Sequence, residues 1–198
     1  LVKLPTLPAA RPAAPPGREV AALVTALQSV LGARAGTYAQ TAADVLDNET
    51  LARQNSNPEY AQLLASWGRQ TGFFAAFDLQ TPADATALGL LRASVIISRY
   101  SAPAGARAAY VYVLEQQAKV GKRLDLQEQP GARLPWDEAV VFYRQMDANG
   151  RALGQYTLIF RAGGLIGFVS NAGTADAVSP TDTADLTKAV IEQLAALR

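Results

Sequence analysis

The stretch that decides the fold is EAVVFYRQMDANGRALGQYTLIFRAGGLIGFVS, residues 138–170. Three runs of β-branched and aromatic residues occupy Glu138–Met146, Leu153–Arg161 and Leu165–Ser170. Asn149-Gly150 and Gly163-Gly164 separate them, and both pairs favour tight turns because they accept the positive φ angles that short hairpins need. The stretch therefore predicts three antiparallel strands in a meander.

Further strands are predicted upstream of this meander. Phe73 and Phe77 lie on one face of an alternating segment, Arg69–Leu79, and Leu91–Ser101 is β-branched and of similar length. The segment between these two is too short for a helical crossover, so we expect antiparallel pairing. A shorter alternating run, Lys122–Glu128, predicts one more strand.

Four segments carry helical signals. Arg18–Leu31 spaces its apolar residues for a helix, Asn57-Pro58 begins a second that ends at Gly68, and Ala104–Lys119 predicts a third. Ser179-Pro180 begins the last, which runs to Leu197. The pattern of Gly36–Leu46 is too weak to assign, and Asn48 is expected to cap a short turn containing Leu51.

Hairpins outnumber strand–helix–strand units, which favours an α+β class. We predict a single antiparallel sheet of about five to six strands, packed by helices, with an N-terminal helical segment. Residues 1–17 contain five prolines and predict an extended spacer, either a trimmed terminus or a linker that holds the domain off a membrane or a partner. Residues 18–198 are then one α+β domain.

Composition narrows the function more than any motif does. The chain has 198 residues, a net charge of +1, and neither histidine nor cysteine. Nucleic-acid binding is not expected, since the chain has no basic run. The usual general base, thiolate chemistry and most metal ligands are missing, so we expect no enzyme activity, no cofactor and no metal. A helix that spans a bilayer needs about 18 consecutive apolar residues, and the chain contains no such run.

Two groups of acidic residues are candidates for a metal or catalytic site. Asp44, Asp47 and Glu49 offer oxygen ligands, but their spacing fits no calcium loop, and a solvated turn with a helix cap is the better interpretation. Asp137 and Glu138 are adjacent at the start of a strand, so their side chains are expected to point to opposite faces. We therefore predict no catalytic residue.

Four residues are the candidates for an interaction surface. Trp67 and Arg69 belong to types common at interface hot spots, although a core tryptophan followed by a glycine cap and a surface arginine would also fit. Phe74 and Tyr143 would line an apolar cleft or a protein interface if they lie on the sheet face that the helices leave free. Helices covering part of both faces would be the simpler explanation.

The layout resembles small extracytoplasmic bacterial proteins of the PsbP/Mog1-like and LpqN-like types. Three segments carry the resemblance: WGRQTGFFAAF (67–77), SVIISRYSAPAGARAAYVYV (94–113) and YTLIFRAGGLIGFVS (156–170). The resemblance implies a lipoprotein, a sensor domain or an accessory subunit of a membrane complex, located outside the cytoplasm. It carries over no site residue.

The leading hypothesis is a non-catalytic, extracytoplasmic binding or accessory module that associates with a protein partner, such as a membrane-bound complex. The alternative is a carrier or sensor domain for a small apolar ligand, with a cleft between the sheet and the helices. That cleft would be lined by aromatics such as Phe73, Phe77 and Phe160. A hydrolase that uses a pair of carboxylates ranks last, because no convincing pair is present.

Overall fold

The computed structural model describes residues 17–34, 36–81, 89–125, 135–148 and 151–197. The described chain forms five helices: α1 (Arg18–Leu31), α2 (Asn48–Gln54), α3 (Glu59–Ser66), α4 (Pro103–Ala118) and α5 (Pro180–Ala195). It also forms seven strands: β1 (Thr37–Leu46), β2 (Arg69–Thr81), β3 (Leu90–Tyr100), β4 (Lys122–Leu124), β5 (Glu138–Ala148), β6 (Arg151–Ala162) and β7 (Leu165–Thr174).

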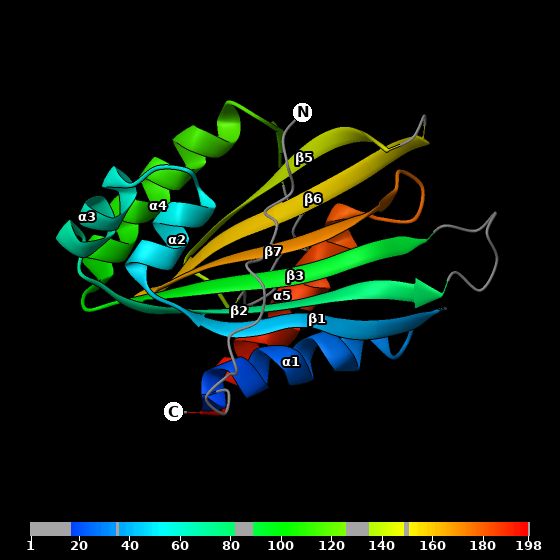
Figure 1. The fold of residues 1–198 in the computed structure, drawn as a ribbon, viewed down its shortest axis with the longest axis horizontal. Coiled ribbons are helices and arrows are strands. Elements are labelled where there is room, and N and C mark those ends of the chain that lie inside the picture. Colours follow the sequence, from blue (N-terminus) through cyan, green and yellow to red (C-terminus); the bar gives the residue numbers. More distant parts are fainter. Residues whose placement is uncertain (1–16, 35, 82–88, 126–134, 149–150, 198) are drawn as a thin grey trace.

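The seven described strands form a single antiparallel sheet, in the order β1-β2-β3-β7-β6-β5-β4 (Figure 1). The α+β class is confirmed, and the sheet has seven described strands instead of the predicted five to six. The missing strand is β1, which lies in the segment that the sequence left unassigned. Its small residues, such as Ala42 and Ala43, pair with β2 without a strong apolar alternation.

The predicted meander is confirmed. Ala148 pairs with Arg151, with residues 149–150 outside the described chain, and Ala162 pairs with Leu165 around a turn in which Gly163 has a φ of +59°. The short strand predicted at 122–128 is β4, and its residues from 126 onward also fall outside the described chain. So does the predicted spacer, apart from Gly17.

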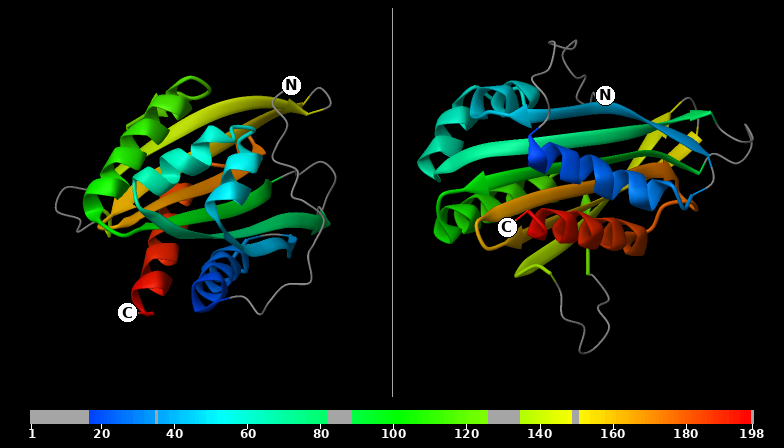
Figure 2. Two further views of the ribbon diagram at one scale, coloured as in Figure 1. Left: turned by 60° about the vertical axis from the view of Figure 1, so that its left-hand side comes forward. Right: turned by 90° about the horizontal axis from the view of Figure 1, so that it is seen from below.

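Helices lie on both faces of the sheet. In Figure 2, α1 and α5 lie side by side across one face, while α2, α3 and α4 gather at one end of the opposite face. We call these the α1/α5 face and the α2–α4 face. The simpler explanation of the aromatic distribution is therefore right, because Phe73 packs on the first face and Phe74 on the second.

The α1/α5 face holds the main core. Val20, Leu23 and Leu27 of α1 and Leu186 and Val190 of α5 are buried against the sheet. The cluster also contains the aromatics Phe73, Phe77, Trp136 and Phe160. This apolar layer is the main source of stability that the described chain offers, because burial of apolar surface is the dominant favourable term in folding.

The α2–α4 face carries two smaller clusters. One lies under α4 and contains Tyr110 and Phe142, and the other lies under α2 and α3 and contains Leu51, Leu64 and Phe74. Trp67 packs against both of them. The helix α4 packs on one cluster, and the helices α2 and α3 pack on the other. A gap remains between α4 and the other two helices, and this gap is the candidate site.

Candidate ligand-binding cleft

A cleft of about 340 Å³ opens on the α2–α4 face, between α2 and α3 on one side and α4 on the other. Its floor comes from β3 and β7, where Ile96 pairs directly with Phe168 and Ser98 pairs with Ile166. The volume falls within the usual range for small-molecule sites. The cleft therefore lies between sheet and helices, as the alternative hypothesis required.

The lining is half apolar and half polar. The residues that line the cleft are Leu51, Asn55, Asn57, Tyr60, Ile96, Ser98, Tyr100, Tyr112, Val113, Gln116, Gln117, Ile166 and Phe168. Among these described residues none is charged. Aromatic rings and aliphatic groups can bury an apolar ligand body, and the hydroxyl and amide groups can fix its orientation.

The local structure of α2 and α3 sets one wall. Asp47 caps α2, since its side chain accepts a hydrogen bond from the Thr50 backbone N–H at 2.6 Å, so the cap is Asp47 and not the predicted Asn48. This hydrogen bond lowers the pKa of Asp47. Pro58 rather than Asn57 occupies the N-cap position of α3. Both helices are short, and the turn between them brings Asn55 and Asn57 to the cleft.

Three tyrosines line this site. Tyr112 of α4 stacks on Tyr60 of α3, with ring centroids 5.8 Å apart, and these rings join the two walls. Burial raises the pKa of Tyr60 to about 12 and raises that of Tyr100 further. Both hydroxyls therefore stay neutral at physiological pH, where they can donate and accept hydrogen bonds.

Arg69 is placed differently from its expected position. The sequence allowed a surface arginine, whereas the Arg69 side chain lies beneath α2 and the residue is only 5% exposed. Its Nη1 donates to Asn48 Oδ1 at 2.7 Å and its Nε donates to Ser98 Oγ at 3.0 Å. Its Nη2 is buried without a hydrogen-bond partner in the described chain. Ser98 thus links the guanidinium to the cleft floor.

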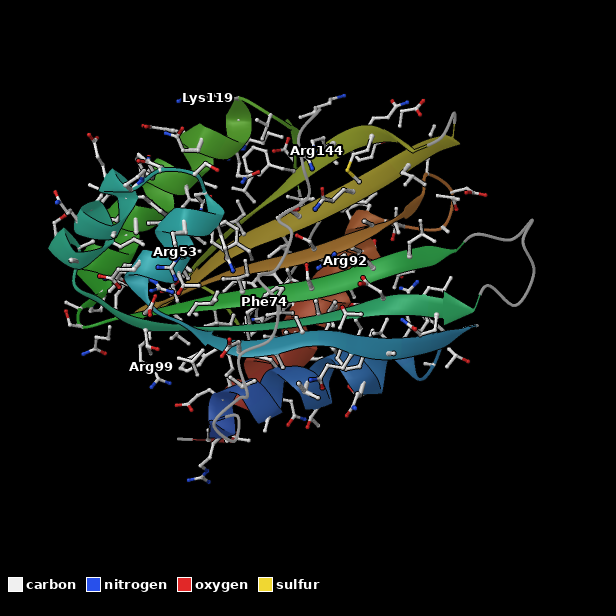
Figure 3. The ribbon with its side chains drawn as sticks, in the orientation of Figure 1. Arg53, Phe74, Arg92, Arg99, Lys119 and Arg144 are labelled. Atoms are coloured by element: carbon white, nitrogen blue, oxygen red, sulfur yellow. The ribbon has the colours of Figure 1, made fainter. Side chains whose placement is uncertain are left out.

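The other three candidates do not form one surface with Arg69. Trp67 is half-buried at the end of α3 and lies 5.3 Å from the Tyr112 ring. Phe74 is buried among Leu46, Leu51 and Leu64 on the α2–α4 face (Figure 3 labels it on β2). Tyr143 packs on Tyr156, which belongs with the α1/α5 core. Phe74 and Tyr143 therefore lie on opposite faces and cannot line one cleft.

The cleft also differs from the predicted one in its residues. Phe73, Phe77 and Phe160, the expected lining, belong to the α1/α5 core, where Phe73 also lines a separate hollow with Leu194 and Leu197. Ile96 and Phe168, which form the floor, were not among the predicted site residues. Their signal was the alternation of β3 and β7, which separates the two faces of each strand but does not identify the face on which helices leave a gap.

The acidic residues form no metal site in the part of the chain that the structure describes. Asp137 and Glu138 do not diverge as expected, because both bind Arg161, at 2.8 Å and 2.7 Å. Asp137 precedes the first residue of β5, so strand alternation does not govern its direction. The two carboxylates are thus held by a single guanidinium. Among the described helices, none is long and apolar enough to cross a membrane.

Comparisons with known proteins give a structural neighbour and no family. No protein-family model matches the chain, and no curated protein matches it in sequence. The crystal structure of the extracellular domain of PknH from Mycobacterium tuberculosis is similar in fold, with a TM-score of 0.52 and 11% sequence identity. The match covers 94% of this chain and 98% of that one. At this identity the likeness shows that the two share a fold.

Proposed function

We propose that this chain is a non-catalytic, extracytoplasmic binding module that holds a small ligand with an apolar body in the cleft of the α2–α4 face. The observation that carries the proposal is the cleft itself, about 340 Å³ with Ile96, Ile166 and Phe168 at its floor and Tyr60 and Tyr112 in its walls. An apolar floor gives affinity through burial, and the hydroxyls and amides around it give orientation.

Two further observations support the proposal. The chain has no histidine or cysteine, and no described residue that lines the cleft is charged, so the site lacks the usual groups for acid–base or nucleophilic chemistry. The structural neighbour is itself an extracellular domain, which supports an extracytoplasmic location. The resemblance to PsbP/Mog1-like and LpqN-like proteins points to the same location.

The test uses N-phenyl-1-naphthylamine, an uncharged fluorescent probe. The expected result is saturable binding by the wild-type protein that Ile96→Trp removes, because the larger ring fills the floor of the cleft. Ala172→Trp is the matched control, since Ala172 lies further along β7 on the same face and does not line the cleft. Equal probe binding by the wild type and Ile96→Trp would contradict the proposal.

A protein partner, for example a membrane-bound complex, is the second candidate function. It is favoured by a shallow groove between α3 and α4, where Tyr60, Leu63 and Tyr112 lie close to Trp67. Clusters of tyrosine and tryptophan are typical of interface hot spots. A photo-crosslinking residue at Ser66, in this groove, should capture one stoichiometric partner from native membranes, and the same residue at Ala172 should not.

A further inference from the structure

Arg69 lies next to the cleft as a buried cation that no carboxylate of the described residues pairs with. Within the described chain it forms no ion pair, and its two hydrogen-bond acceptors are the neutral Asn48 and Ser98. The Asp47 carboxylate acts on it electrostatically, but that carboxylate accepts the hydrogen bond that caps α2. Burying an unpaired charge is costly, so proteins usually supply a counter-ion.

The orientation of the guanidinium shows where such a counter-ion would lie. Nη1 is anchored on Asn48, away from the sheet. Nε and Nη2 share the opposite edge of the guanidinium plane, which is an edge that a carboxylate or phosphate can grip with two parallel hydrogen bonds. On that edge Nε donates to Ser98 Oγ, and Nη2 is buried against Gly72 without a hydrogen-bond partner in the described chain. Ser98 lines the cleft, so the Nε–Nη2 edge lies behind the Ser98 hydroxyl, which separates it from the cleft.

The backbone beside Arg69 makes room for this arrangement. Gly72 pairs directly with Ser98, and a Cβ at Gly72 would collide with Arg69 Nη2. The absence of a side chain there lets the guanidinium pack against β2, the strand next to the cleft floor. Burial lowers the pKa of Arg69, as expected for a cation without a compensating carboxylate, and the nearby Tyr60, Tyr100 and Asp47 oppose that shift. Guanidinium nevertheless stays charged at neutral pH.

We infer that the ligand of the cleft is an amphipathic anion, whose carboxylate or phosphate pairs with the Nε–Nη2 edge of Arg69 by displacing the Ser98 hydroxyl, while its apolar body lies over Ile96 and Phe168. The inference rests on the proposed function, because it names the chemical class of ligand for the same cleft. The inference adds that the ligand carries a negative charge, which the uncharged lining residues alone do not predict.

The test compares two probes that differ by one sulfonate group. 1-Anilinonaphthalene-8-sulfonate carries an oxyanion, and N-phenyl-1-naphthylamine is the same skeleton without it. The wild-type protein should bind the sulfonate about tenfold more tightly or better, the range expected of a charge-assisted hydrogen-bonded pair. Arg69→Met should remove this preference while keeping affinity for the neutral probe, and Arg69→Lys should keep part of it.

Arg53→Met is the matched control, since Arg53 is an exposed cation on α2 that does not line the cleft. It should leave the preference unchanged, which separates a specific pair from a general effect of net charge. Displacement of the sulfonate probe by decanoate or by decyl phosphate then shows which oxyanion the site prefers. Decanol should displace it poorly.

Two failures are distinguishable. Equal affinity of the wild type for the two probes, with both lost in Ile96→Trp, would overturn the requirement for an anion and leave the cleft as a neutral site. Binding of neither probe would overturn the proposed function itself. The affinities of the wild-type protein for the two probes can be compared without any variant. The inference therefore stays testable if Arg69→Met fails to fold.

Discussion

The α1/α5 face and the α2–α4 face belong to the same sheet, yet they exclude water to different degrees. On the first, two long helices lie side by side and bury a continuous layer that includes Phe160, Leu158 and Val169, each 0% exposed. On the second, three helices cover only one end and leave a cleft floored by half-buried residues such as Ile96 and Phe168 (Figures 1 and 2). The comparison indicates that one face supplies stability and the other offers a binding surface.

The largest expected effect on stability comes from truncating one phenylalanine on each face of the sheet. Phe160→Ala should lower the free energy of unfolding by about 3–5 kcal/mol, because it opens a cavity in a close-packed layer. Phe168→Ala should cost less, since Phe168 is half-buried beside an existing cleft, but it should weaken probe binding. Urea denaturation and probe titration measure the two effects, and equal losses of stability would contradict the division.

A smaller effect is expected from a glycine that lets α4 approach the rest of the α2–α4 face. A Cβ at Gly105 would collide with the Trp67 carbonyl oxygen, so Gly105→Ala should push the start of α4 away and cost about 1–3 kcal/mol. Because α4 is a wall of the cleft, probe binding should fall as well. Gly89→Ala is the control, since no atom lies within 4 Å of the position of its Cβ; unchanged binding in Gly105→Ala would count against α4 as a wall.

The smallest effect concerns Tyr110, which is buried on the α2–α4 face and whose hydroxyl has no hydrogen-bond partner in the described chain. Burial, aided by Glu138, raises its pKa to about 12, whereas a tyrosine in an unfolded chain titrates near 10. Its contribution to stability is therefore fully present below about pH 10 and is lost as the pH rises through about 12.

Tyr110→Phe should leave stability at pH 7 nearly unchanged and should reduce the loss of stability between about pH 10 and 12. Chemical denaturation at pH 7 and at alkaline pH measures both quantities. A large loss at pH 7 would show that the hydroxyl does have a partner.

Local signals explain what the sequence could predict. The meander of β5, β6 and β7 was predictable because its turn residues and its alternation lie within a few residues of one another. The edge strand β1 was missed because its small residues make a weak pattern, and its identity depends on pairing with β2. Local residues define a hairpin, whereas partners distant in the sequence define an edge strand.

The site was less predictable for a different reason. Arg69 was selected from the sequence, but its burial depends on Gly72, Asn48 and Ser98, which only the pairing of β2 with β3 brings together. Likewise, alternation placed Phe73 and Phe74 on opposite faces without indicating which helices cover each one. A gap between packed helices leaves no periodic signal in any one segment.

The strand order has a consequence for folding kinetics. β1, β2 and β3 form one local group and β5, β6 and β7 another, and the two join where β3 pairs with β7, strands that are more than sixty residues apart in the sequence. Such distant pairing is slow, because the entropy of closing a long loop is lost before the contacts form. The floor of the cleft straddles this seam, since Ile96 comes from β3 and Phe168 from β7. A nascent chain therefore gains its binding competence only when its two halves dock, and fluorescence of a cleft probe during refolding should report that late step alone.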